Sequence, residues 1–270
     1  MSAPDESIST LVEQVRKGAK YQSISTDLIA SLLAVELAKR ENNRQAVKAV
    51  RSKLHQVAAA YQEKPIPYAD YLVEMDALPA DLTDGQVRTF LSRAMLAHAS
   101  TRERAPILPE FYQRCLEPLG HIHSVLDLAS GLNPLSIPWM PLQPGFTYTA
   151  CDIYADMVEF LNAFFKRFNL NGTALVCDIT HELPNVAADL ALVLKTVPCL
   201  EQLDKHSGRN LLEKITSPNI LLSFPVRSLG GKSKGMAQHY ERHFFELVAE
   251  KHWRISRYEF PGELAFLIQK

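Results

Sequence analysis

Hydrophobic residues recur at helical spacing through the first hundred positions of the chain. Val47, Val50, Leu54 and Val57 follow one another at intervals of three and four residues, which places them on one face of a helix. Neighbouring segments show similar spacing, and none alternates as a strand does. The sequence therefore predicts a small N-terminal helical bundle. Its predicted helices cover residues 9–19, 26–37, 43–61, 68–78 and 84–99.

From Ser124 onwards, short apolar segments alternate with helical ones. Repeated strand–helix–strand units indicate a parallel sheet covered on both faces, and Pro261-Gly262 indicates a closing antiparallel hairpin. The predicted fold is α/β, with a Rossmann-like sheet of seven strands that ends in this hairpin. We expect a helical domain at residues 1–105 and the sheet domain at residues 106–270. Predicted strands cover residues 124–128, 147–153, 174–178, 189–194, 220–224, 253–260 and 263–269, and predicted helices cover 155–168, 202–215 and 237–251.

The first of these strands ends in an acid and opens into a glycine turn. Asp127 stands near the end of the strand and Gly131 occupies the turn. Such a turn lies at the carboxyl edge of a parallel sheet, where open α/β sheets bind ligands. Because the Gly-x-Gly-x-x-Gly dinucleotide fingerprint is absent, the candidate ligand is smaller, and S-adenosylmethionine (SAM) fits best. An ordinary strand and turn is the alternative.

Acidic residues stand at the ends of three successive predicted strands, as Asp127, Asp152 and Asp178. Asp152 follows the glycine turn by some 20 residues, the separation at which an acid meets ribose hydroxyls in nucleotide-binding sheets. Asp178 is placed to accept a hydrogen bond from an adenine amino group. Caps on the following helices are the alternative for all three acids. The predicted SAM site comprises Arg102, Arg104, Asp127, Ala129, Gly131, Asp152, Ile153, Asp178, Ile179 and Lys195.

Two further segments contain candidate chemistry. Arg102 and Arg104 suit a bidentate grip on the SAM carboxylate, although an exposed ion pair with Glu103 is the alternative. Lys195 ends the fourth predicted strand, where SAM enzymes hold the methyl acceptor, so we expect it to position the target. Cys199 follows, and a cysteine nucleophile is a second hypothesis. Since Cys199 lies between apolar residues, a core position is the favoured interpretation.

The composition is that of an ordinary globular protein, with 47% hydrophobic residues, 22% charged residues and a net charge of -1. No apolar run of about 18 residues and no signal peptide is evident, so we expect a cytoplasmic protein with no membrane partner. The four cysteines are widely spaced, and no Cys-x-x-Cys or His pair has metal-binding spacing. We therefore expect no metal site, and the net charge does not indicate a DNA-binding protein.

Positive charge is nevertheless concentrated in two places. Residues 16–53 contain nine Lys or Arg against three acids, an excess of +6, and residues 225–236 form a basic, glycine-containing loop. Both patterns suit contact with a phosphate backbone, and solvated helix faces are the alternative. The predicted RNA-binding residues are Lys17, Lys20, Arg51, Lys53, Arg227, Lys232 and Lys234, of which Arg227 is also expected, with Lys195, to position the target.

Four segments together resemble a known family, the 16S ribosomal RNA guanine-N7 methyltransferases of aminoglycoside resistance (the Arm family, of FmrO type). They are His98-Ala-Ser-Thr-Arg-Glu-Arg104, Val125-Leu-Asp-Leu-Ala-Ser-Gly-Leu-Asn-Pro134, Cys151-Asp-Ile153 and residues 223–236. Arg51-Ser-Lys-Leu-His55 with Tyr61 fits the N-terminal part. The resemblance extends over nearly the whole chain, and the Arg-Ser-Leu-Gly-Gly loop is much more specific than the glycine turn.

The resemblance implies a SAM-dependent enzyme that methylates N7 of a guanine in the decoding region of 16S rRNA, within the assembled 30S subunit. It implies that Arg104 holds the SAM carboxylate, Gly131 lies against the methionyl part, Asp152 binds the ribose and Asp178 binds the adenine. It also implies RNA contacts for Lys195, Arg227, Lys232 and Lys234. We expect a monomer that binds the 30S subunit through its helical domain.

Two other functions stay open at this point. One is SAM-dependent methylation of another RNA position or of a small molecule. The other is a non-catalytic ribosome-binding module that keeps an inactive SAM fold, against which the intact Asp152, Asp178 and Gly131 argue.

Overall fold

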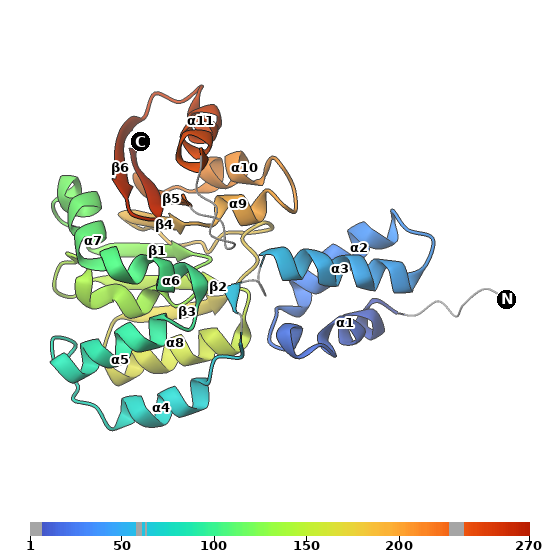
Figure 1. Ribbon diagram of the computed structural model, residues 1–270, viewed down its shortest axis with the longest axis horizontal. Coiled ribbons are helices and arrows are strands. Elements are labelled where there is room, and N and C mark those ends of the chain that lie inside the picture. The colour runs from blue at the N-terminus through green and yellow to red at the C-terminus, as the bar shows by residue number, and fades with distance from the viewer. Residues whose placement is uncertain (1–6, 58–60, 63, 227–234) are drawn as a thin grey trace.

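The computed structural model describes residues 7–57, 61–62, 64–226 and 235–270. Its strands form one sheet in the order β3-β2-β1-β4-β5-β7-β6 (Figure 1). β1 to β5 are parallel, whereas β7 runs antiparallel to both β5 and β6. The predicted seven-stranded Rossmann-like sheet with a terminal hairpin is confirmed. The strands are β1 (Ser124–Leu128), β2 (Thr147–Asp152), β3 (Gly172–Val176), β4 (Leu190–Leu194), β5 (Asn219–Pro225), β6 (Arg254–Phe260) and β7 (Glu263–Gln269).

The strand order reverses between β1 and β4, and this reversal determines where a ligand can bind. From β1 the chain continues to β2 and β3 on one side, and then returns to β4 on the other side of β1. The loops that follow β1 and β4 therefore diverge and leave a crevice at the carboxyl edge of the sheet.

Buried side chains cover both faces of the sheet. Every residue of β4 is buried, and neighbouring residues point to opposite faces, so Leu192 packs into one apolar cluster and Val193 into the other. α8 packs on one face, and α10 and α11 pack on the other. This burial explains why central strands such as β4 and β5 appear in the sequence as short, nearly continuous apolar runs. Within the part of the chain that the structure describes, no helix has the length and hydrophobicity needed to span a membrane.

The helices agree broadly with the predicted ones, with shorter ends. The predicted helix over 84–99 ends at Met95, because His98 adopts an extended conformation and begins a separate helix. The predicted helix over 202–215 begins only at Ser207, after a short helix at residues 197–200. The helices are α1 (Ile8–Arg16), α2 (Thr26–Leu37), α3 (Asn43–Val57), α4 (Tyr68–Asp76), α5 (Gly85–Met95), α6 (Ala99–Arg104), α7 (Leu108–Leu116), α8 (Ala155–Arg167), α9 (Val197–Leu200), α10 (Ser207–Lys214) and α11 (Met236–Val248), with short 3-10 turns that include η1 (Ala19–Tyr21) and η5 (Asn133–Trp139).

The N-terminal helices do not form one bundle. α1, α2 and α3 pack against one another beside the sheet, whereas α4 and α5 lie next to α8 (Figure 1). The rings of Tyr68 and Tyr71 in α4 pack against Phe160 in α8, with centroids 5.2 and 6.1 Å apart. The boundary after residue 105 stays a prediction, and the packing of α4 and α5 favours an earlier boundary, between α3 and α4.

A short backbone pairing connects the N-terminal helices to the sheet. Ser25 donates its N–H to the Ile153 carbonyl at 2.8 Å, and Ala155 donates its N–H to the Ser23 carbonyl at 2.7 Å. Ser25 also caps α2, because its hydroxyl accepts the N–H of Leu28. Because residues 153–155 directly follow Asp152, this pairing places the start of α2 beside the carboxyl end of β2.

Candidate active site at the carboxyl edge of the sheet

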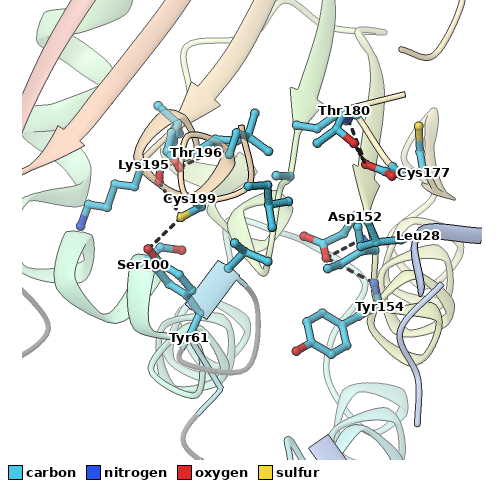
Figure 2. A pocket seen from close by; sticks show the side chains of 18 of the residues that line it. Leu28, Tyr61, Ser100, Asp152, Tyr154, Cys177, Thr180, Lys195, Thr196 and Cys199 are labelled. Carbon is cyan, nitrogen blue, oxygen red and sulfur yellow. Dashed lines mark hydrogen bonds between the residues drawn. The ribbon is translucent and has the colours of Figure 1, made fainter. Parts of the chain in front are cut away.

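A cavity of about 760 Å³, including its opening to solvent, lies at the carboxyl edge of the parallel strands. Its walls come from the loops after β1, β2, β3 and β4 and from the N-terminal helices, as Figure 2 shows. Six of the predicted cofactor-site residues line it: Ala129, Asp152, Ile153, Asp178, Ile179 and Lys195.

Asp152 is the acid that the fold holds most firmly at this cavity. Its side chain is buried and accepts backbone N–H groups from Gly131 at 2.8 Å, Ile153 at 2.7 Å and Tyr154 at 3.3 Å. Burial raises the pKa of Asp152 above its ordinary value, against the lowering effect of these hydrogen bonds. Since a carboxylate has about four acceptor positions, three bonds leave one for a ligand hydroxyl.

The neighbouring strand places Asp178 on the same wall. Its Oδ1 accepts both the N–H and the hydroxyl of Thr180, at 3.0 and 2.6 Å. Ile153 and Ile179 line the cavity with the two acids. Two carboxylates that alternate with apolar side chains suit a nucleoside, whose ribose and amino group donate hydrogen bonds and whose base is flat and apolar. The described residues therefore fit the adenosine part of SAM.

Gly131 has no side chain, and this leaves room for His98 on the opposite wall of the cavity. Its φ is +53°, and a Cβ built there would lie 2.8 Å from Cε1 of His98. His98 lines the cavity, is buried, and its Nδ1 lies 2.9 Å from the Ser100 hydroxyl. Burial, together with Arg102, Arg104 and Lys195, lowers the pKa of His98 to about 4, so the imidazole is neutral at physiological pH.

The structure places Arg104 and Asp127 outside the cavity lining, which differs from their predicted roles. Arg104 is 1% exposed, and its guanidinium donates to Glu263 from Nη2 at 2.7 Å and to Asn133 from Nη1 at 3.1 Å. Asp127 accepts bonds from Asn133 at 2.9 Å and Tyr148 at 2.7 Å, and burial raises its pKa to about 6. Both side chains are therefore committed to a buried polar network. Arg102 donates to the Leu96 carbonyl and is also outside the lining.

Lys195 lines the cavity, but its ammonium group belongs to the same network. The side chain is buried, and Nζ lies 2.7 Å from Oε2 of Glu103 and 3.4 Å from Oε2 of Glu263. Its backbone adopts a left-handed φ of +59°. The prediction that Lys195 faces RNA therefore differs from the structure, since the charge is directed into the protein.

Tyr61 and Cys199 complete the wall on the side of the N-terminal helices. The Tyr61 hydroxyl lies 2.9 Å from the Cys199 sulfur, and its ring stacks on His98 with centroids 6.0 Å apart. Burial raises the pKa of the Cys199 thiol to about 11, and burial with the adjacent Cys199 raises the pKa of the Tyr61 phenol. These features support a structural cysteine rather than a nucleophile. Sequence reasoning missed Tyr61, His98 and Glu263 as site residues, although the first two belong to the segments that carry the family resemblance.

Four of the seven predicted RNA-binding cations lie within the described residues, and only two of these four are exposed. Lys17 and Lys20 are exposed, but Arg51 donates to the Val15 and Gln14 carbonyls at the end of α1, and Lys53 pairs with the buried Glu36 at 2.7 Å. Arg51 and Lys53 therefore hold the helices together. The other three, Arg227, Lys232 and Lys234, lie outside the described residues. Among the described residues, no cluster of three His, Cys, Asp or Glu side chains could hold a metal ion.

Known proteins resemble this chain along its whole length. Residues 17–267 match the family model described as "Ribosomal RNA methyltransferase (FmrO)". A 16S rRNA (guanine(1405)-N(7))-methyltransferase of Micromonospora echinospora is 36% identical over 271 residues, which cover 100% of this chain and 99% of the relative. A protein of the same name from Serratia marcescens is 30% identical, with 97% of this chain and 98% of the relative covered.

Solved structures give the same result. The 16S rRNA methyltransferase RmtF, in complex with S-adenosyl-L-homocysteine (SAH), is 28% identical and superposes with a TM-score of 0.82 over 99% of this chain and 100% of that one. The 16S rRNA methylase RmtB is 25% identical, with a TM-score of 0.80 over 98% of both chains. The predictions of an rRNA methyltransferase and of SAM as its cofactor are confirmed. This chain belongs to the FmrO family of ribosomal RNA methyltransferases.

Proposed function

We propose that this enzyme transfers a methyl group from SAM to N7 of a guanine in the decoding region of 16S rRNA, within the assembled 30S subunit. The observation that carries the proposal is the end-to-end similarity to relatives named 16S rRNA (guanine(1405)-N(7))-methyltransferases, 33 to 36% identical over the full chain. An N7 methyl group adds bulk and positive charge where a cationic aminoglycoside would bind. Resistance to such drugs is therefore the expected consequence.

The lining supports binding of the adenosine part of SAM, and we assign its two carboxylates, Asp152 and Asp178, to the cofactor rather than to a general base. SAM, when bound, supplies a methyl group on a positively charged sulfur. Asp152 and Asp178 would hold its ribose and adenine, and Ile153 and Ile179 would pack against the base. His98 is neutral, and the thiol of Cys199 and the phenol of Tyr61 stay protonated near pH 7.

This arrangement suits methylation of guanine N7 in particular. That nitrogen has a lone pair and no proton, so it can attack the methyl group without a base. Catalysis then depends on aligning the two reactants and excluding water. Because N7 faces the deep major groove of paired RNA, the target base must leave its stack to enter the cavity.

The exposed cations of α1 to α3 supply the proposed contact with rRNA. Lys17, Lys20, Arg44 and Lys48 are all exposed. Arg44 and Lys48 lie one turn apart on α3, and Arg51, which contacts the end of α1, follows on the same side of that helix. The four cations can therefore neutralise phosphates along α1 to α3, and α2 and α3 contribute Leu28 and Val57 to the cavity wall. The enzyme would act as a monomer in the cytoplasm.

The test uses purified protein, radiolabelled SAM and intact 30S subunits from a susceptible bacterium. The modified position is mapped by reverse transcription after chemical cleavage at N7-methylguanine. We expect one labelled guanine in the decoding region. Label in free rRNA or in a small molecule, with none in 30S subunits, would overturn the proposed target and leave the SAM-dependent fold intact.

A further inference from the structure

Glu263, the first residue of β7, does not line the cavity. It connects three segments that form the cavity walls. The side chain is 1% exposed. Its Oε1 accepts from Nη2 of Arg104 at 2.7 Å and from the Ser223 hydroxyl at 2.6 Å, and its Oε2 lies 3.4 Å from Nζ of Lys195. Burial by itself would raise the pKa of Glu263, but Arg104 and Lys195 lower it below the ordinary value. Glu263 is therefore a buried carboxylate, and both of its oxygens have polar partners.

The partners of Glu263 belong to the walls of the cavity. Arg104 is the last residue of α6, and the first turn of that helix contributes Ser100 to the lining. Arg104 also donates to Asn133, which follows the Gly131 turn. One carboxylate on the terminal hairpin thus restrains both α6 and the loop after β1.

Lys195 extends the same restraint to the loop after β4. Figure 2 shows its side chain pointing away from Asp152, and this side chain is buried. A left-handed φ is unfavourable for a lysine and persists only where its surroundings determine it. The Ser223 hydroxyl, which donates to Glu263, also accepts the Lys195 N–H at 3.2 Å. Glu263 and Ser223 therefore hold both ends of Lys195, from which the lining residues Thr196 and Cys199 follow.

We propose that Glu263 is a positioning residue for the SAM site: it fixes Arg104 and Lys195 so that the His98–Ser100 wall and the 195–199 wall keep the separation that the cofactor requires. The identity of the ligand rests on the proposed function. The role of Glu263 is nevertheless tested by measuring the Kd of SAH alone, without any rRNA.

Glu36 offers a matched control within the same chain. It is 2% exposed and pairs with two cations, Arg40 and Lys53, as Glu263 does. It lies in the last part of α2, two turns beyond the cavity residue Leu28. Glu36→Gln therefore removes a buried charge, whose cation partners are partly exposed, from a place that does not support the cavity walls.

The experiment measures the Kd of SAH by calorimetry for wild type, Glu263→Gln and Glu36→Gln, at a temperature where circular dichroism shows each variant to be folded. We expect Glu263→Gln to weaken SAH binding by about tenfold or more, and Glu36→Gln by less than about twofold. In turnover assays, the KM for SAM should rise more than kcat falls. Equal effects of the two variants, or unchanged SAH binding in Glu263→Gln, would overturn the proposal.

A milder variant keeps the test decisive if Glu263→Gln does not fold. Ser223→Ala removes the hydroxyl group that bonds Glu263 and the Lys195 N–H, while the Ser223 carbonyl still accepts that N–H at 3.0 Å and every charge stays in place. We expect SAH binding about threefold weaker, and no change would overturn the proposal. If wild type binds SAH but does not label 30S subunits, the proposed target fails while this comparison still stands.

Discussion

Gly131 and Asp152 are joined by a 2.8 Å hydrogen bond from the glycine N–H to the carboxylate, and this bond couples the loop after β1 to the end of β2. The same glycine leaves room for the His98 ring on its other side. Gly131 therefore contacts both walls of the cavity, through its N–H on the Asp152 side and through its missing side chain on the His98 side.

Gly131→Ala should therefore impair cofactor binding strongly. The added Cβ would displace His98, which is hydrogen-bonded and buried. The alanine backbone would also have to adopt a φ of +53°, which is unfavourable for a residue with a side chain. We expect the Kd of SAH to rise by about tenfold or more. Gly145→Ala is the control, because Gly145 has a φ of +76° with open space around it. If both variants bind SAH equally well, the close approach of Gly131 to His98 does not contribute to cofactor binding.

Asp152→Ala should lose the hydrogen bond that we assign to the ribose. A hydrogen bond to a charged group contributes about 1.5–3 kcal/mol, so SAH binding should weaken by about 10- to 100-fold. Asp189→Ala is a suitable comparison, because Asp189 also accepts two backbone N–H groups, from His123 and Ser124, but at the opposite edge of the sheet. Calorimetry of both variants measures the difference. Unchanged SAH affinity in Asp152→Ala would refute the assignment of the ribose site.

Cys199→Ala should retain catalysis. The thiol is buried, bonded to Tyr61 and has a pKa of about 11, so little thiolate exists near pH 7. We expect kcat to change by less than about tenfold, which corresponds to about 1.4 kcal/mol. Single-turnover assays with 30S subunits measure this change. Complete loss of activity, together with a covalent adduct between wild type and RNA, would restore the nucleophile hypothesis.

Much of this site follows from local sequence. The location of Asp152 and Asp178 at the sheet edge can be predicted because an acid at the end of a strand is visible within a few residues of the chain. The central strands can be assigned because burial on both faces makes them almost entirely apolar, as in β4. The glycine turn after β1 can be recognised for the same reason.

The rest depends on contacts between distant residues, which local patterns do not contain. Arg104 is the right kind of residue for a carboxylate, but Glu263, 159 residues later, occupies its guanidinium. Arg51 donates to the Val15 carbonyl, 36 residues earlier. Tyr61 lines the cavity in a structure where residues 23–25 pair with residues 153–155, a contact between segments some 130 residues apart.

Charge reversal of the exposed N-terminal cations should weaken binding to 30S subunits and spare SAH binding. The variant replaces Lys17, Lys20, Arg44 and Lys48 with Glu, and leaves Arg51 and Lys53 intact because they hold the helices together. The dependence of log K on log salt should become shallower by about one for each phosphate that the variant no longer neutralises. Reversal of Lys166 and Lys205, which are exposed on α8 and before α10, is the control. Equal 30S affinity in both variants would exclude this surface.

Acidification should destabilise the folded enzyme through His98. Its pKa is about 4 in the folded state and about 6.5 when unfolded, so between these values the unfolded chain binds the additional proton. The neutral imidazole therefore contributes stability that is fully present above pH 6.5 and is lost as pH falls toward 4. The loss at pH 5 is on the order of 2 kcal/mol.

Urea unfolding of wild type and His98→Gln at pH 7 and pH 5 measures this contribution. The variant should lose less free energy of unfolding on acidification than wild type does. Burial raises the pKa of Asp127 to about 6, so below that pH its carboxyl acts in the opposite direction, but it is present in both proteins and cancels in the comparison. His121→Gln, at an exposed position, controls for the removal of one histidine. Identical pH dependence in wild type and His98→Gln would mean that the imidazole is not held neutral against Gly131, and that the wall it forms is more accessible to water than the structure indicates.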